Sequence, residues 1–241
     1  MLSNGAKKSY TFRHELKYLI KSWQQEIIAA KLGCFLEKDA HVKKGIYTIR
    51  SLYFDDRINS AYEEKLMGTA ERKKYRIRLY NYSDKKISLE CKNKQGNYIF
   101  KEGAPLTRDE TERIIAGDYD FLMDRNEDVC KTFYYQCMVN ELRPRVIVDY
   151  ERIPFVYDLG TVRVTFDSNI RESVLTGSLF DEELPYFDVM APDELILEVK
   201  YTELLPEFIS DVLTTQEAVY VAASKYVMCC DSIIRRNGIL L

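Results

Sequence analysis

Short segments in which polar and apolar residues alternate run through most of this chain of 241 residues. A period of two residues, with many β-branched and aromatic side chains, is typical of β-strands that present two different faces. The alternation is clear in five segments: 11–20, 74–80, 87–92, 162–167 and 195–201. Three further segments of similar composition are expected to be strands: 46–54, 97–102 and 145–156. The sequence therefore predicts about eight strands.

Helices are expected between and after these strands. Residues 22–25 and 107–110 have the capping-box pattern, in which Ser or Thr precedes Gln or Glu by three positions. The expected helices cover 22–32, a segment beginning at 107, 57–67, 120–141 and a long C-terminal stretch from Pro206 to Arg236 that Gly238 ends. Strands outnumber the connections that could form parallel crossovers, which favours a mainly antiparallel sheet. Without an internal repeat or linker, the simplest organisation is one α+β domain over residues 1–241.

Composition excludes several classes of protein. The chain has 35 Lys and Arg against 38 Asp and Glu, a formal net charge of −3, so it is not a generally basic nucleic-acid-binding protein. No apolar stretch reaches the roughly 18 residues that a membrane span needs. The first nine residues contain no apolar segment of a secretory signal, which favours a cytoplasmic location with free thiols. Six cysteines without a Cys-x-x-Cys pair, and two histidines, argue against zinc.

Most of the charge in the expected strands lies at positions of one parity, which share one face. Ten of these positions are basic: Arg13, Lys17, Lys74, Arg76, Arg78, Lys92, Lys94, Arg152, Arg163 and Lys200. Four are acidic: Glu15, Glu90, Asp167 and Glu198. The face therefore carries a surplus of six positive charges in a chain that is negative overall.

Such a face differs from an ordinary solvent-exposed one, where like charges are usually separated. Arg and Lys bind phosphate oxygens, and carboxylates hold Mg²⁺ or Mn²⁺ against them. We interpret the face as a binding surface for a polyanion with a divalent metal. About eight strands can close into a barrel, so we expect a closed antiparallel tunnel with a charged lumen and helices packed outside.

An ordered set of motifs accompanies these charges. It comprises residues 12–20, 50–55, 62–68, 72–80, 89–92, Lys101, 150–152, 162–164, 197–200 and 224–226. In order and approximate spacing, from about residue 10 to 230, the set resembles the VTC domain, the catalytic domain of the vacuolar transporter chaperone complex. That family belongs to the triphosphate tunnel, or CYTH-like, group. The resemblance implies a polyphosphate polymerase that uses ATP with Mn²⁺, or Mg²⁺, as its metal.

Carried onto this chain, the resemblance implies three sets of site residues. The catalytic cations would be Arg76, Arg78, Lys92, Arg163 and Lys225. Substrate would bind to Lys17, Lys101, Tyr150, Arg152, Lys200 and Ser224. The metal would be held by Glu198, with Glu15 and Glu90 as further candidates. The expected ligands are ATP, pyrophosphate and polyphosphate rather than nucleic acid; a membrane partner and the oligomeric state stay open.

One departure from the wider group bears on the reaction. Tunnel triphosphatases and related cyclases open with Glu-x-Glu-x-Lys, whereas this chain has Arg13 at the first acidic position, before Glu15 and Lys17. The loss of one metal ligand argues against the hydrolase and cyclase branches.

Two other functions stay open, a triphosphate hydrolase and a polyphosphate-binding module without turnover. Glu15 and Glu90 could equally form structural ion pairs with Lys17 and Lys92. In the polymerase interpretation, a tunnel open at both ends would let the product leave.

Overall fold

The computed structural model describes residues 13–38, 45–96, 98–157, 162–214 and 218–240. Eight long strands make up most of one antiparallel sheet: β1 (His14–Lys21), β3 (Tyr47–Asp55), β4 (Glu71–Tyr80), β5 (Ser83–Gln95), β6 (Tyr98–Leu106), β7 (Arg143–Tyr157), β8 (Val162–Ser173) and β10 (Glu194–Tyr201). Three two-residue strands join it: β2 (Glu37–Lys38), β9 (Phe187–Asp188) and β11 (Val219–Tyr220). The predicted strands and the α+β class are confirmed, although residues 11, 12 and 97 of the expected strands lie outside the described ranges.

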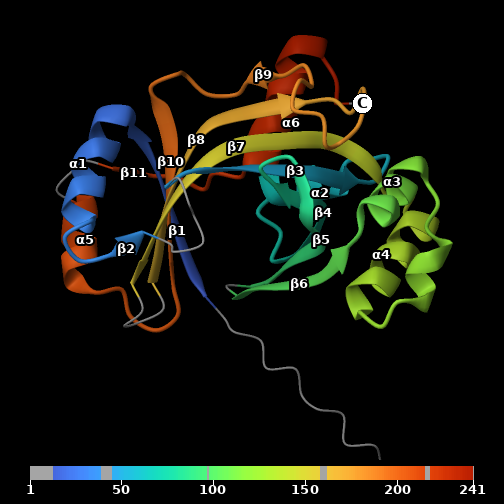
Figure 1. Cartoon of the computed structure of the whole chain (residues 1–241), viewed down its shortest axis with the longest axis horizontal. Coiled ribbons are helices and arrows are strands. Elements are labelled where there is room, and N and C mark those ends of the chain that lie inside the picture. The colour runs from blue at the N-terminus through green and yellow to red at the C-terminus, as the bar shows by residue number, and fades with distance from the viewer. Residues whose placement is uncertain (1–12, 39–44, 97, 158–161, 215–217, 241) are drawn as a thin grey trace, which may run out of the picture.

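In the described ranges, six α-helices and one 3₁₀ helix complete the fold. They are α1 (Ser22–Leu32), α2 (Ser60–Leu66), α3 (Arg108–Ala116), the 3₁₀ helix η1 (Asp120–Asp124), α4 (Asp128–Val139), α5 (Glu207–Thr214) and α6 (Lys225–Asn237). Figure 1 shows α1 and α5 beside one flank of the curled sheet and α3 and α4 beside the other. In the part of the chain that the structure describes, no helix is long and apolar enough to cross a membrane.

Three details of the expected helices are wrong. The expected helix over 120–141 is divided into the 3₁₀ helix η1 and α4, with Arg125 between them in an extended conformation. The capping box of α1 starts one residue earlier than predicted, because the Gln24 side chain accepts a hydrogen bond from the backbone N–H of Lys21. The expected C-terminal helix is divided into α5 and α6, with β11 between them pairing to β1. An apolar run such as 219–227 fits a strand or a helix equally well, so periodicity did not reveal the break. Gly238 does end α6, in the left-handed conformation.

The outward face of the sheet is covered by two apolar clusters. On one flank, Ile77 and Leu89 pack with Phe133 of α4, and all three are fully buried. On the other flank, Val164 and Leu197 pack with helices α1 and α5. Full burial of one such side chain contributes roughly 1.5–3 kcal/mol. The alternation predicted from the sequence therefore turns the apolar parity outward against the helices, and leaves the charged parity facing inward.

The sheet curls but its backbone ladder does not close. The strand order runs β11-β1-β10-β8-β7-β3-β4-β5-β6, with no hydrogen-bonded pairing between β6 and β1 or β11 in the described residues. A side-chain contact crosses the gap instead, because Lys92 of β5 lies 2.9 Å from Glu15 of β1. The expected tunnel is therefore a curled sheet with a seam along its two edges. The expected closure of the sheet by backbone hydrogen bonds is therefore not found among the described strands.

Helix α6 covers one end of the inward face. Its Tyr226 stacks on Tyr53 of β3, with ring centroids 5.0 Å apart, and its Ile233 joins the same apolar cluster as Val148 and Ile196 of the sheet. These strand positions have the inward parity. The expectation of a lumen open at both ends is thus wrong in one respect, since a packed helix occupies one end.

Candidate functional site

The charged part of the inward face surrounds two adjoining cavities. The outer one, which we call the mouth, has a volume of about 500 Å³, and the deeper one, the chamber, about 110 Å³. Both are lined by Glu15, Arg76, Arg78, Lys92, Arg152 and Lys200, so the two cavities adjoin. The chamber ends at Ser224, Lys225 and Tyr226, where α6 begins.

Thirteen of the fourteen site residues expected from the sequence line the mouth or the chamber: Glu15, Lys17, Arg76, Arg78, Lys92, Lys101, Tyr150, Arg152, Arg163, Glu198, Lys200, Ser224 and Lys225. The exception is Glu90, which is buried behind the cations. Their convergence follows from parity and register. Glu15, Lys200 and Arg163 form one cross-strand row, and Lys17, Glu198 and Thr165 form the next.

Glu198 lies deep among cations. One carboxylate oxygen is 2.5 Å from Lys200 Nζ, and the other is 3.5 Å from an Arg152 guanidinium nitrogen. Burial alone would raise the pKa of Glu198, but Lys200 and Lys17 hold it well below its usual value. The carboxylate is therefore held in its ionised form among these cations.

Glu15 connects the two edges of the sheet. Its oxygens lie 2.9 Å from Lys17 Nζ and 2.9 Å from Lys92 Nζ. Burial would raise the pKa of the Glu15 carboxyl, but Lys17 and Lys92 bring it down to about 2. Glu198 acts in the opposite direction, as a like charge close by. The two carboxylates are therefore near enough to influence each other, which a shared cation would relieve.

Glu90 orients the cations instead of lining the cavity. It accepts two hydrogen bonds from Arg76, at 2.9 and 2.7 Å, and one from Lys101 at 2.8 Å. Arg76 also donates to the Tyr53 hydroxyl at 2.8 Å. Both Arg76 donors converge on one oxygen of Glu90, and the Tyr53 contact holds the guanidinium from a third nitrogen, so its orientation is fixed. Of the three carboxylates expected to hold the metal, Glu15 and Glu198 line the chamber together, whereas Glu90 does not line it.

Asp167 is a site residue that the sequence analysis placed on the charged face but gave no role. It is fully buried, accepts hydrogen bonds from Arg152 at 2.6 and 2.7 Å, and lies 2.5 Å from Lys225 Nζ. Lys225 also lies over the Tyr150 ring, 4.7 Å from its centroid. Asp167 thereby holds one cation from the sheet and one from α6 at the chamber wall. The position of Asp167 on the charged face could be predicted from the alternation in its strand. Its pairing with Arg152 could not, because that depends on the register between β7 and β8.

Ser224 and Lys225 were expected inside a long helix, and their position differs from that. Ser224 is the N-cap residue of α6 and Lys225 its first helical residue. The Ser224 hydroxyl accepts a hydrogen bond from Lys74 Nζ at 3.3 Å. Backbone N–H groups at a helix N-terminus favour anions, so the start of α6 adds to the attraction of the chamber for phosphate.

Several cavity residues were missing from the expected site. Tyr47, Tyr53 and Lys74 line it, and the Tyr47 hydroxyl accepts from Arg163 at 3.4 Å. Burial lowers the pKa of Lys74 to about 7, with further repulsion from Arg72 and Lys65. The chain has 18 tyrosines, so the sequence alone did not distinguish Tyr47 and Tyr53 from tyrosines that only pack in the core. Lys74 was visible by parity alone.

The full set of charges around the mouth and chamber is strongly cationic. It has eleven basic residues: Arg13, Lys17, Lys74, Arg76, Arg78, Lys92, Lys101, Arg152, Arg163, Lys200 and Lys225. Four carboxylates are on or directly behind the wall: Glu15, Glu90, Asp167 and Glu198. A small polyanion is the ligand chemistry that offsets such a surplus.

A preformed metal cage is absent from the described ranges, because no group of three or more His, Cys, Asp or Glu side chains converges there. The chemistry of Glu198 and Glu15 still fits a divalent cation bound jointly with phosphate. Mg²⁺ and similar ions often take one or two carboxylates and complete their shell with substrate oxygens and water. Both carboxylates line the chamber.

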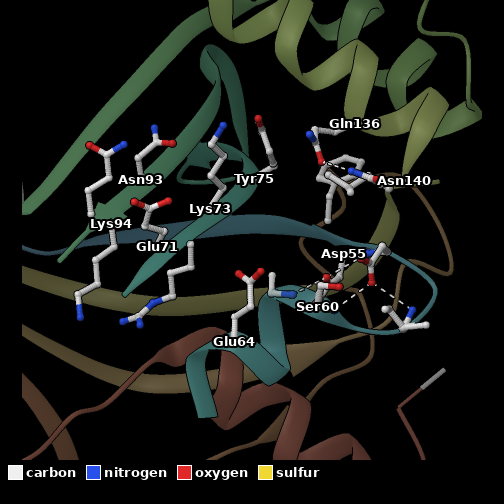
Figure 2. A pocket seen from close by; sticks show the side chains of 17 residues that line it. Asp55, Ser60, Glu64, Glu71, Lys73, Tyr75, Asn93, Lys94, Gln136 and Asn140 are labelled. Atoms are coloured by element: carbon white, nitrogen blue, oxygen red, sulfur yellow. Dashed lines mark hydrogen bonds between the residues drawn. The ribbon is translucent and has the colours of Figure 1, made fainter. Parts of the chain in front are cut away.

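A separate cavity, of about 520 Å³, lies beside β4 and β5, between α2 and α4, and Arg72 and Lys94 also reach it. Figure 2 shows Lys73 and Asn93 pointing into it, with Glu64 and Asp55 across from them. Asp55 already accepts the backbone N–H groups of Ala61 and Tyr62 at the start of α2. Mixed charge and satisfied carboxylates make this cavity a poor site for a polyanion.

Proteins of known structure share this architecture. A protein from Bacillus halodurans proposed to be an adenylate cyclase superposes with a TM-score of 0.53 at 13% identity, covering 92% of this chain and 95% of that chain. A protein from Hippeastrum proposed to be an adenylyl cyclase, with a dominant triphosphatase activity, gives 0.52 at 13% identity, covering 95% and 97%. The chain therefore shares the fold of these two proteins.

The sequence itself identifies the family. Residues 12–234 match the VTC domain, so the chain belongs to the VTC domain family. No curated protein matches this sequence. The family resemblance inferred from the ordered motifs is therefore confirmed.

Proposed function

We propose that the protein transfers the γ-phosphoryl group of ATP to the end of an inorganic polyphosphate chain. The observation that carries this proposal is the adjoining mouth and chamber with eleven cations and four carboxylates. The membership in the VTC domain family supports the same substrates. No Cys or His side chain lines either cavity in the described residues, which favours direct transfer without a thiol or imidazole intermediate.

In the proposed reaction, a terminal oxygen of polyphosphate attacks the γ-phosphorus and forms the new P–O bond. The bond from that phosphorus to the β–γ bridging oxygen breaks, and ADP leaves with the electron pair. Arg76 and Arg152, each held by a carboxylate, would bind the equatorial oxygens and stabilise their charge. The walls of the chamber would hold donor and acceptor in line.

A divalent cation, Mn²⁺ or Mg²⁺, would be held by Glu198 together with Glu15. When bound, it would neutralise negative charge on the substrate phosphates. Lys200, now 2.5 Å from Glu198, would then turn to a phosphate oxygen. Glu15 on β1 and Glu198 on β10 would thus give oxygen ligands to the metal, and Lys200 on β10 would contact the substrate.

A triphosphate hydrolase is the second candidate. The same cation cage would serve if water attacked in place of the polyphosphate end, and the Hippeastrum protein of the same fold has a triphosphatase activity. Arg13, which lines the mouth where the wider group has a glutamate, argues against this candidate.

Incubation of the purified protein with ATP and Mn²⁺, followed by separation of products by size, tests the proposal. Formation of long chains together with ADP is the expected result. Orthophosphate as the sole phosphate product would make the protein a hydrolase, and unchanged ATP with retained polyphosphate binding would make it a binding module. A variant with Arg76→Ala measures background from contaminating enzymes.

A further inference from the structure

A further cavity, of about 250 Å³, opens at the seam between the two edges of the sheet. Its walls come from β4 and β5 on one side and from β1 and the segment 220–224 on the other. It shares Glu15, Lys17, Lys74 and Lys92 with the chamber. The chamber therefore adjoins this side opening as well as the mouth.

Four of the cations that line the side opening form no ion pair in the described residues, and the acidic influence on one of them, Arg72, comes from Glu64. Within the described residues, Lys65, Arg72, Lys74 and Lys94 form no ion pair with any carboxylate. Glu15 is the one carboxylate in this wall, and Lys17 and Lys92 already pair with it. The positive charges of this wall repel one another, and a bound anion would relieve that repulsion.

Register explains why these charges gather. Arg72 pairs with Lys94 across β4 and β5, and Lys74 pairs with Lys92 in the next row on the same face. Like charges directly opposite each other are unfavourable in a sheet. Figure 2 shows Lys94 turned to the opposite side of the strands from Lys73 and Asn93. The rows therefore extend the inward cationic face to the edge of the seam.

The other exit from the chamber is occupied. Tyr226 at the chamber end stacks on Tyr53, and its hydroxyl donates to the buried Asp55 at 2.5 Å. Behind it, Cys229, Cys230 and Ile233 are buried against the sheet. A chain that enters at the mouth and reaches the chamber meets packed helix ahead, and an open cationic passage at its side.

We propose that a phosphate chain too long for the chamber leaves it through the seam, where Lys65, Arg72 and Lys94 bind its phosphates. This inference rests on the proposed function and deepens it, because a triphosphate fits within mouth and chamber whereas a growing polymer needs a second opening. The passage would bend beside the Lys92–Glu15 contact, which borders all three cavities. Long-chain polyphosphate is thus the ligand of the side opening.

The test compares affinities for tripolyphosphate and for long-chain polyphosphate at low salt. In the wild type, long chains should bind more tightly. In the double variant Lys65→Ala/Lys94→Ala, the ratio of the two affinities should fall about tenfold, which equals about 1.4 kcal/mol. The matched control Lys31→Ala/Lys131→Ala removes two lysines from α1 and α4, far from the inward face, and should keep the wild-type ratio.

The outcomes separate this inference from the proposed function. Equal ratios in the double variant and the wild type would overturn the seam as a binding path, even if ATP is still polymerised. A wild type that binds both probes equally would also overturn it. If the wild type binds neither tripolyphosphate nor long-chain polyphosphate, the proposed function itself is overturned. Shorter products from ATP in the double variant, with the melting temperature kept, would support the inference.

Discussion

The two halves of the inward face use the same strands for opposite purposes. On β10, Ile196 packs against the α6 cluster, whereas Glu198 and Lys200, two and four residues later on the same face, line the chamber. On β7, Val148 belongs to the apolar half, and Arg152 to the charged half. A strand face can therefore change from core to binding site within one row of the sheet.

The difference between the halves has an energetic meaning. The apolar half gains stability by burying side chains, whereas the charged half holds more cations than carboxylates and is repulsive without an anion. Binding sites of this kind cost stability that the rest of the fold must offset. Variants in the two halves should therefore separate cleanly, with stability lost in the apolar half, and binding or turnover lost in the charged half.

Tyr226→Ala should have the largest effect on stability. The change removes an aromatic ring that is 1% exposed and a hydrogen bond to Asp55, so the free energy of unfolding should fall by about 3–5 kcal/mol. Urea unfolding monitored by circular dichroism measures this. Tyr135→Ala, on the exposed side of α4, is the control and should change stability by less than about 0.5 kcal/mol. Equal effects would mean that α6 is not part of the core.

Glu198→Gln should abolish most turnover without unfolding the protein. Glutamine keeps the size of the side chain but loses the charge for a divalent cation, and turnover should fall about 100- to 1,000-fold, or about 2.7–4 kcal/mol. Polyphosphate binding without metal should persist or tighten, because a negative charge has left the site. The control is Glu194→Gln on the same strand, where Glu194 pairs with Lys21. Near wild-type turnover with Mn²⁺ would move the metal role to Glu15.

Arg76→Ala should weaken both binding and turnover. The substitution removes a guanidinium that Glu90 and Tyr53 hold in the chamber wall, and the transition state should lose about 2–4 kcal/mol of stabilisation. Steady-state kinetics and tripolyphosphate titration measure the two effects. The charge-matched control is Arg113→Ala. Arg113 lies on α3, and its substitution breaks an exposed ion pair with Asp118. If the two variants behave alike, the charged half is not the site.

Tripolyphosphate should stabilise the wild-type protein. A ligand at ~100 times its dissociation constant adds roughly 2.7 kcal/mol, and the melting temperature should rise by several degrees. High salt should reduce the shift, because exposed charges are screened. Sulfate at equal ionic strength is the control for a general anion effect. An unchanged melting temperature at low salt would count against phosphate binding in either cavity.

The smallest expected effect concerns pH. Burial, followed by Arg72 and Lys65, lowers the pKa of Lys74 to about 7, so this lysine is charged at pH 6 and neutral at pH 9. Binding of phosphate near a neutral Lys74 requires proton uptake, and affinity for long-chain polyphosphate should fall about fivefold as pH rises between these values. Titrations at both pH values measure this. Lys74→Gln should flatten the difference; an unchanged slope would exclude Lys74 as its source.

The strands and the charged face were predictable because both depend on a period of two residues. The alternating segment 74–80 assigned Arg76 and Arg78 to one face and Ile77 to the other, as the structure has them. The family motifs then supplied roles for the cations. Neither step required knowledge of which strands are neighbours.

The apolar half and the partner of each cation depended on contacts between distant segments. Val146, Ile147 and Val148 form a continuous apolar run, which is typical of a strand buried on both faces and was the available signal for α6. The pairing of Asp167 with Lys225 joins residues on β8 and α6, and no local pattern encodes it. The break between α5 and α6 was hidden for the same reason, since β11 forms only by pairing with β1.

The most direct test of the comparison is a crystal structure with tripolyphosphate bound. We predict phosphate oxygens within hydrogen-bond distance of Arg76 and Arg152 in the charged half of the inward face, with α6 still packed on Tyr53. Phosphate density in the cavity between α2 and α4, with the mouth and chamber empty, would contradict the account.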